Sequence, residues 1–301
     1  MISPKYTHTV FYLGLTGLVG LGLYHLLQTR CPFSRIFQCK KFPPESTFVD
    51  DKAWVDLKLS KITDVNHNCK IFRFDLPSKN HVTGIHVASA LLTQFQLPSQ
   101  PPVIRAYTPI SSEETLGYME FLIKKYENGP MSSYIHNMKI NDKLSFKGPI
   151  PKYFWTPNKH DRVYMIAGGT GITPMYQLIR KIFKEKEDKT DVTLIFSNEN
   201  ILLHKEFEEL KKKHPNRFHV TYLLDEPPEN WEGVSGRVNK NLLESILPGP
   251  SSQNIKIFVC GPLGFYQAIS GTKRSPSDQG DLEGMLKELG YDKEQVKLLN
   301  M

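Results

Sequence analysis

The spacing of hydrophobic and polar residues divides the chain into parts with different expected structure. Between Trp54 and about Ile150, short runs alternate apolar and polar positions and are separated by turn residues, as in WVDLKLSKI, KIFRFDL, MEFLIKKY and KLSFKG. Alternation with a period of two predicts strands that bury one face. This part is therefore expected to form an antiparallel β barrel or sandwich.

From Arg162 onward, strand-like runs alternate with helical patterns. The strand-like runs are RVYMIAG, DVTLIFS, FHVTYLLD and IKIFVCG, and the helical runs PMYQLIRKIF and HKEFEELKKK lie between them. Strands and helices in alternation predict a doubly wound α/β domain, with a parallel sheet and helices on both faces. The change from one pattern to the other falls near residues 157–161.

A third pattern is a long apolar segment near the N-terminus. Residues 10–27 contain no Asp, Glu, Lys or Arg, and about eighteen helical residues span roughly 27 Å, close to the thickness of a bilayer core. A cleaved secretory signal is the alternative, but the small-x-small cleavage pattern is missing. We expect a retained transmembrane anchor over residues 1–30 and a proline-containing linker over 31–50. Most of the flanking positive charge follows the apolar segment, which favours a catalytic body on the cytosolic side.

Composition and charge narrow the classes of protein. A chain of 301 residues with 40% hydrophobic residues is long enough for two domains. The net charge of +7 is scattered along the chain, which favours an acidic partner or an anionic surface over nucleic acid, with a merely solvated basic surface as the alternative. The four cysteines match neither a metal site nor a CxxC pair, so we expect no metal and no disulfide framework.

The strongest candidate for a ligand site is a glycine-rich turn. Residues 167–174 (AGGTGITP) follow an apolar strand pattern and precede a helical one. In this context the backbone approaches the phosphates of a nucleotide closely, with a purely structural tight turn as the alternative. Pro174 replaces the third glycine of the dinucleotide fingerprint and suits the first helical turn, and Thr173 is expected to cap the helix.

Two segments of the first part are further candidates. Arg105 stands two residues before Tyr107 on one face of an expected strand, so the cation can hold a phosphate while the ring stacks on a flat heterocycle. Residues 122–124 (LIK) end a strand, and residues 129–132 (GPMS) open a helix whose first N–H groups suit a pyrophosphate. An ordinary edge strand and a simple capped helix are the alternatives.

Two candidates follow strands of the second part. Cys260, Gly261 and Pro262 close the strand IKIFV, so the thiol is expected at the carboxyl edge of the sheet, with an inert buried cysteine as the alternative. Asp225 ends the strand FHVTYLLD. Its carboxylate would accept hydrogen bonds from the ribose hydroxyls of NADH and repel the extra phosphate of NADPH, although an aspartate that only starts a turn fits as well.

In this order, the motifs resemble those of the flavoprotein pyridine-nucleotide cytochrome reductases, and among them the fungal mitochondrial NADH-cytochrome b5 reductases. The resemblance runs from about residue 51 to 295 and is carried by segments 105–111 (RAYTPIS), 129–132 (GPMS), 146–150 (FKGPI), 168–174 (GGTGITP), 201–203 (ILL) and 260–262 (CGP). It implies a ferredoxin-reductase-like fold, with an FAD-binding β-barrel domain over residues 51–157 and an NADH-binding α/β domain over residues 158–301.

The resemblance also implies a role for each motif. Thr108 and Cys260 are the expected catalytic residues, because Thr108 would donate a hydrogen bond to flavin N5 and Cys260 would shape the nicotinamide pocket. Arg105 and Ser132 would hold the FAD pyrophosphate. The full set of expected cofactor-binding residues is Arg105, Ala106, Tyr107, Thr108, Leu122, Lys124, Pro130, Met131, Ser132, Gly168, Gly169, Thr170, Gly171, Thr173, Pro174, Asp225, Cys260, Gly261 and Pro262.

Two positions depart from the family pattern. Ala106 stands where proline is usual, and Pro130 stands where lysine is frequent, which removes one cation and one N–H group from the phosphate site. These departures motivate one alternative from another class, a membrane-tethered scaffold that keeps the fold without a cofactor.

The function implied by the resemblance is electron transfer. Hydride would pass from NADH to FAD, and single electrons would then pass to cytochrome b5 or a similar acidic haem protein, steered by a basic rim that includes Lys124, Lys125 and Lys147. A quinone or another small acceptor is the alternative. We expect a monomer with no nucleic-acid partner, anchored by its N-terminal helix in the mitochondrial outer membrane, with the endoplasmic reticulum as the alternative.

Overall fold

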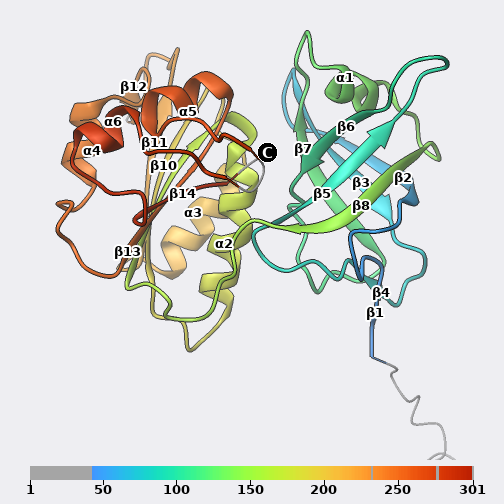
Figure 1. The fold of residues 1–301 in the computed structure, drawn as a ribbon, viewed down its shortest axis with the longest axis horizontal. Helices are drawn as coiled ribbons and strands as arrows, with labels where there is room; N and C mark the ends of the chain where they lie inside the picture. Colours follow the sequence, from blue (N-terminus) through green and yellow to red (C-terminus); the bar gives the residue numbers. More distant parts are fainter. Residues whose placement is uncertain (1–42, 232, 276–277, 300–301) are drawn as a thin grey trace, which may run out of the picture. The chain divides into compact units, whose positions relative to one another are not determined.

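The computed structural model describes residues 43–301, apart from 232, 276–277 and 300–301 (Figure 1). The expected anchor over residues 1–30 and most of the expected linker lie outside this described part. Within it, no helix has both the length and the apolar character that a membrane crossing requires.

The first half of the described chain forms one six-stranded antiparallel sheet. Its strands are β2 (Val55–Asp64), β3 (Cys69–Asp75), β5 (Ser89–Phe95), β6 (Val103–Tyr107), β7 (Tyr118–Lys124) and β8 (Lys143–Pro151). They lie in the order β6-β5-β8-β2-β3-β7, so β6 and β7 are the two edges. We predicted a barrel or sandwich. In the described part of the chain these strands form one sheet, and no ladder joins its edge strands β6 and β7.

The core of this sheet follows from the period-two pattern of its strands. Phe72 and Phe74 of β3 face inward with Phe121 of β7 and Phe146 of β8, and all four side chains are almost fully buried. Phe74 meets Phe146 edge to face with ring centroids 4.9 Å apart, a preferred geometry for aromatic rings. Helix α1 (Pro130–Asn137) adds Met131 to this core. Two short strands, β1 (Glu45–Ser46) and β4 (His81–Val82), pair in parallel beside it.

The second half forms a six-stranded parallel sheet in the order β12-β11-β10-β9-β13-β14. Its strands are β9 (Arg162–Gly168), β10 (Asp191–Asn198), β11 (Phe218–Leu224), β12 (Val234–Ser235), β13 (Ile255–Cys260) and β14 (Val296–Leu298). The connecting helices are η2 (Gly169–Gly171), α2 (Ile172–Lys184), α3 (His204–Lys213), α4 (Lys240–Ile246), α5 (Leu263–Ile269) and α6 (Gly284–Glu288). The predicted doubly wound parallel sheet is confirmed.

Both faces of the parallel sheet are covered by helices (Figure 1). In β9, Met165 packs in the cluster that contains residues of α2 and α3, whereas its neighbour Ile166 packs in the cluster on the α4, α5 and α6 side. Successive residues point to opposite faces, so a strand covered on both sides is apolar throughout. The chain runs from β9 outward to β10 and β11 and then returns to β13 on the other side of β9. Ligands of such sheets bind at this switch point, outside the carboxyl ends of the strands.

The start of helix α2 differs from the prediction that Thr173 caps it. Residues 169–171 form a turn of 3-10 helix that leads directly into α2, so the N-cap is Gly171 and Thr173 lies inside the first turn. The Thr173 hydroxyl instead donates to the carbonyl of Thr170 at 3.1 Å. The 3-10 turn begins the helix earlier than the position of Pro174 suggests.

Candidate functional site

A first pocket lies beside the edge strand β6 and the start of α1. It has a volume of about 240 Å³. We call it the sheet pocket, and its lining residues are Arg105, Ala106, Tyr107, Thr108, Tyr126, Gly129, Pro130, Met131, Ser132 and Thr170. All of them except Tyr126 and Gly129 were predicted from the sequence as cofactor-binding residues, and they come from three separate segments of the chain.

The groups that line the sheet pocket suit an anionic cofactor with a flat ring. Arg105 is exposed, and its guanidinium uses one N–H for the carbonyl of Ile104 at 2.7 Å, which leaves its other donors for a ligand. Helix α1 begins at Pro130 without an acidic residue in its first turn, so its N-terminus favours negative charge. Burial raises the pKa of Tyr107 to about 12, so its phenol is neutral at physiological pH and offers an uncharged ring face. These residues fit FAD.

Ser132 is less accessible than the sequence suggested. It is buried, its hydroxyl donates to the carbonyl of Gly129 at 3.1 Å, and its oxygen accepts the N–H of Tyr126 at 3.2 Å. The hydroxyl therefore fixes the loop between β7 and α1 as well as lining the pocket. Its backbone N–H, in the first turn of the helix, is the group best placed for a phosphate.

A second pocket lies at the carboxyl edge of the parallel sheet and has a volume of about 400 Å³. We call it the edge pocket, and its lining residues are Lys124, Tyr126, Gly168, Gly169, Ser197, Asn198, Glu199, Asp225, Arg237, Val238, Pro262, Gly264, Phe265, Ala268 and Ile269. Most of them lie at or after the ends of β9, β10, β11 and β13. Arg237 and Val238 follow β12, and Lys124 and Tyr126 come from the end of β7 in the other sheet. This is the position where doubly wound sheets bind nucleotides.

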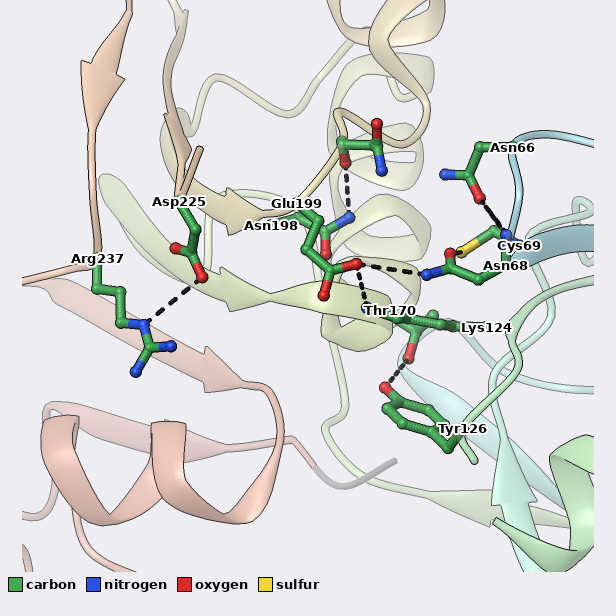
Figure 2. Close-up of polar contacts among 11 residues, drawn as sticks. Asn66, Asn68, Cys69, Lys124, Tyr126, Thr170, Asn198, Glu199, Asp225 and Arg237 are labelled. Atoms are coloured by element: carbon green, nitrogen blue, oxygen red, sulfur yellow. Dashed lines mark hydrogen bonds and ion pairs between the residues drawn. The ribbon is translucent and has the colours of Figure 1, made fainter. Parts of the chain in front are cut away.

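Tyr126 connects the two pockets because it lines both of them. Its phenol oxygen lies 3.4 Å from the hydroxyl oxygen of Thr170, which belongs to the glycine-rich turn (Figure 2). Groups bound in the two pockets therefore meet at this tyrosine. Such an arrangement suits a reaction between a cofactor in one pocket and a nucleotide in the other.

Gly171 is required by the close approach of the glycine-rich turn to β13. A Cβ atom at this position would lie 2.3 Å from the carbonyl oxygen of Cys260 and 2.8 Å from the backbone nitrogen of Gly261. No side chain fits there, so the turn and the end of β13 pack backbone to backbone. Gly171 thus shapes the edge pocket without lining it.

Cys260 lies where the sequence predicted, but its thiol is buried. The residue ends β13 at the carboxyl edge as predicted, but its side chain is 0% exposed and lines neither pocket. Leu299 is buried in the same cluster, and the Tyr266 hydroxyl donates to the Leu299 carbonyl. Burial raises the pKa of Cys260 to about 12, which makes it an unreactive thiol.

Other predicted residues also lie outside the pockets. Leu122 is buried in the hydrophobic core, and Thr173 and Pro174 are buried within α2. Successive residues of a strand point in opposite directions, so Leu122 and Lys124 of β7 share one side of the strand, but only the longer lysine reaches the edge pocket. Gly261 packs against Phe265. These residues support the pockets from behind.

Lys124 is an ion-paired residue and not a free charge of a basic rim. Its ammonium nitrogen lies 2.8 Å from the Glu199 carboxylate, and its side chain is 15% exposed (Figure 2). Asn68 donates to the same carboxylate oxygen at 3.3 Å. Lys147 lies over the ring of Trp54, 5.5 Å from its centroid. The predicted rim of Lys124, Lys125 and Lys147 therefore loses its first member.

Among the pocket residues that sequence reasoning missed, three carry polar or charged side chains that bear on binding: Tyr126, Glu199 and Arg237. Arg237 lies 3.5 Å from the predicted ribose-binding residue Asp225 (Figure 2). The two are far enough apart in sequence that only the pairing of β11 with β12 brings them together. Tyr126 had a usable signal, since an aromatic residue directly after a strand that ends in lysines stands next to the expected ligand site.

Family models match both halves of the chain. The oxidoreductase FAD-binding domain matches residues 56–155, and the oxidoreductase NAD-binding domain matches residues 165–271. Together with the two adjoining pockets, these matches define a flavoprotein oxidoreductase that binds FAD and a nicotinamide nucleotide. The cofactor prediction is confirmed.

The relatives identify the family. The NADH-cytochrome b5 reductase 2 of Coccidioides immitis is 52% identical over 298 residues, which cover 98% of this chain and 92% of that protein. The NADH-cytochrome b5 reductase 2 of Emericella nidulans is 53% identical over 94% of this chain and 88% of that protein. The chain belongs to the NADH-cytochrome b5 reductase family, as its motifs predicted.

Solved structures show the same fold. The cytochrome b5 reductase domain of Ulva prolifera nitrate reductase superposes with a TM-score of 0.71 at 26% identity, covering 85% of this chain and 100% of that one. The CS-b5R domains of human Ncb5or, in their NAD+ form, give a TM-score of 0.67 over 82% of this chain and 69% of that one. The predicted ferredoxin-reductase-like combination of an antiparallel and a parallel sheet is confirmed.

Proposed function

We propose that this enzyme oxidises NADH and delivers the electrons one at a time to cytochrome b5 or a similar acidic haem protein. The observation that carries the proposal is the junction of the sheet pocket and the edge pocket at Tyr126. The names of its relatives, which are NADH-cytochrome b5 reductases, support the same acceptor.

The residues of the sheet pocket would hold FAD. Arg105 and the N-terminus of α1 would bind the pyrophosphate, and Tyr107 and Thr108 would lie against the isoalloxazine. When bound, FAD supplies the conversion between the two-electron donor NADH and a one-electron acceptor. Thr108 is 5% exposed and lines the pocket, so its hydroxyl is placed to hydrogen-bond the ring in a site that excludes most water.

The residues of the edge pocket would bind and orient NADH. The turn over residues 168–171 would receive the pyrophosphate, and Asp225 would accept hydrogen bonds from the adenosine ribose. Pro262 and Phe265 line the pocket beside the turn and give it apolar walls. In this arrangement the chain supplies binding, orientation and exclusion of water, and hydride transfer requires no acid or base from the protein.

An acidic acceptor fits the charge of the enzyme. The chain has a net charge of +7, and Lys152, Lys273 and Lys297 lie close together. Burial lowers the pKa of Lys152 and of Lys273, and the positive charge of Lys297 contributes to both shifts. A positive surface raises the encounter rate with an acidic haem protein and makes that rate sensitive to salt. We propose that this lysine cluster contributes to the docking surface, in the role that we first expected of Lys124.

We further propose that residues 10–27 anchor the enzyme as a monomer in the mitochondrial outer membrane, with the catalytic body in the aqueous phase. The support is the length and apolar character of this segment and the basic residues that follow it. Subcellular fractionation of the tagged full chain, with alkaline carbonate extraction, would test this. Recovery with endoplasmic reticulum membranes or in the carbonate-soluble fraction would contradict it.

The acceptor is tested with the purified full-length enzyme. Its visible spectrum is expected to show bound flavin that bleaches when NADH is added under nitrogen. Cytochrome b5 should then be reduced rapidly at low salt, with a rate that falls steeply as ionic strength rises. A flavin that NADH bleaches without reducing cytochrome b5, while a quinone is reduced, would contradict the proposed acceptor. A colourless preparation would favour the scaffold without a cofactor.

A further inference from the structure

An arginine stands beside the ribose-binding aspartate of the edge pocket. The Arg237 Nε atom lies 3.5 Å from the Asp225 carboxylate, and the two side chains point toward each other (Figure 2). Their side chains are 87% and 35% exposed, respectively, so both remain open to a ligand. Both residues line the pocket that would hold NADH.

The backbone around Arg237 fixes this position. Ser235 of β12 pairs with Leu224 of β11, and the N–H of Gly236 donates to the Leu224 carbonyl at 2.8 Å. Gly236 has a φ of +87°, a conformation that glycine adopts without strain, and it turns the chain so that Arg237 comes beside Asp225. Val238 follows and is buried in the adjoining core, with an exposure of 8%. The backbone is fixed by these hydrogen bonds, whereas the guanidinium is exposed to solvent.

The charges in the edge pocket make Arg237 its available cation. The charged residues that line the pocket are Lys124, Glu199, Asp225 and Arg237. Lys124 is 15% exposed and held by Glu199 at 2.8 Å, whereas Arg237 is exposed and makes only a loose contact with Asp225. A guanidinium in this position offers paired donors to any anion that enters beside Asp225.

The anion that belongs beside a ribose-binding carboxylate is a phosphate on the ribose itself. A phosphate monoester carries about −1.5 to −2 charges at pH 7, so Asp225 alone would repel the 2′-phosphate of NADPH. Arg237 offsets that repulsion and can bind the phosphate oxygens through two parallel hydrogen bonds. With NADH bound, the same guanidinium can stay on Asp225.

We propose that this enzyme accepts NADPH as well as NADH, and that Arg237 is the residue that binds the 2′-phosphate. The inference rests on the proposed function, because it assumes that Asp225 lies at the adenosine ribose. It goes beyond that function because the chain would draw on both pools of reduced nicotinamide nucleotide.

The first test compares the two nucleotides in one variant. Arg237→Gln should lower kcat/KM for NADPH by about tenfold or more relative to kcat/KM for NADH, since a charge-assisted hydrogen bond to phosphate is lost. Lys240→Gln is the matched control, because Lys240 is a nearby exposed cation that pairs with Glu288 outside the pocket. It should leave the ratio unchanged. An equal effect of Arg237→Gln on both nucleotides would overturn the proposal.

The second test measures binding without turnover. Titration calorimetry of the flavin-loaded enzyme with 2′,5′-ADP and with 5′-AMP isolates the 2′-phosphate, because the two ligands differ only in that group. The wild type should bind 2′,5′-ADP at least as tightly as 5′-AMP, and Arg237→Gln should lose about tenfold in affinity for 2′,5′-ADP alone. Asp225→Asn should tighten 2′,5′-ADP binding. A wild type that binds 5′-AMP far more tightly would overturn the proposal.

Failure of the NADPH proposal can be distinguished from failure of the proposed function. If NADH does not bleach the flavin of the wild type, the proposed function fails, whatever the calorimetry shows. If NADH bleaches the flavin, NADPH does not, and Arg237→Gln changes neither affinity, then the proposed function stands and the role of Arg237 is rejected.

Discussion

Lys273 is a residue whose protonation is set by its surroundings in the folded chain. Burial, together with the positive charges of Lys297 and Lys152, lowers the pKa of Lys273 to about 8, while Cys260 acts in the opposite direction. The unfolded chain keeps the usual value of 10.5. Between these two pH values the unfolded state binds more protons than the folded state, so the contribution of Lys273 to stability becomes more favourable as pH rises.

Replacing this lysine should therefore stabilise the enzyme at neutral pH. Lys273→Met removes a charge that is disfavoured in the folded state, so the free energy of unfolding at pH 7 should rise. The gain over the wild type should shrink between pH 8 and 10.5, as the wild-type lysine loses its proton. Urea unfolding at pH 7, 9 and 10 measures this gain, with Lys240→Met as the exposed control. A gain that does not depend on pH would contradict the assignment.

The Cys260 thiol should not react with alkylating reagents in the native enzyme. Its thiol is 0% exposed and burial raises its pKa to about 12, so almost no thiolate forms at pH 8. Iodoacetamide treatment followed by peptide mass mapping should leave Cys260 unmodified until the chain is unfolded in urea. Rapid alkylation of Cys260 in the native enzyme would show that the thiol is open to the crevice after all.

At the scale of elements, the nucleotide site depends on the unit formed by β9, the glycine-rich turn and α2. The turn lies against the end of β13, with Gly171 facing the carbonyl of Cys260. This contact is between backbone atoms, so it cannot be relaxed by rotating a side chain. The position of the turn therefore depends on the absence of a Cβ atom at Gly171.

Gly171→Ala should damage both stability and nucleotide binding. The new methyl group would overlap the Cys260 carbonyl, and overpacking of this kind costs about 1–3 kcal/mol of unfolding free energy. The KM for NADH should rise, because the turn that receives the pyrophosphate is displaced. Gly249→Ala is the matched control, since a Cβ there meets nothing within 4 Å. Thermal unfolding and NADH kinetics measure both effects, and equal behaviour of the two variants would refute the argument.

At the scale of the whole described body, the ion pair of Glu199 is one of the polar contacts that join the two halves. Glu199 follows β10 of the parallel sheet, and it binds Lys124 of β7 and Asn68 just before β3 (Figure 2). The Lys124 ammonium holds the pKa of Glu199 below its usual value. The contact lies at the edge pocket, so it both joins the sheets and occupies a cation that a nucleotide phosphate would otherwise attract.

Removing the Glu199 charge should therefore tighten NADH binding. In Glu199→Gln, Lys124 is free to interact with the pyrophosphate, and the KM for NADH should fall about two- to fivefold, in line with the strength of partly exposed ion pairs. Glu187→Gln, at an exposed site away from the pocket, is the control. Steady-state kinetics at low and high salt measure the change. A rise in KM would mean that Glu199 serves mainly to orient Lys124.

Much of the fold was predictable because its elements carry local signals. The strands β2, β3, β7 and β8 follow the alternating runs, and β9, β10, β11 and β13 follow the apolar runs of the second half. Strand β6 was expected around Arg105 and Tyr107 without stated ends. Strand β5 was not predicted, since its buried polar residues Ser89 and Thr93 interrupt the alternation of apolar and polar positions. The short strands β12 and β14 could not be predicted, because two or three residues carry no periodicity.

The sequence by itself determined the family, the two cofactor-binding halves and most residues of the sheet pocket, because contiguous motifs such as residues 105–108 and 129–132 carry them. Only the tertiary structure decided which side chains face a ligand. It buries Cys260 in the hydrophobic core, pairs Glu199 with Lys124 and brings Arg237 to Asp225. The physical reason is that burial and charge pairing depend on neighbours that are distant in the chain, whereas a strand–turn–helix motif is complete within a few residues of its own sequence.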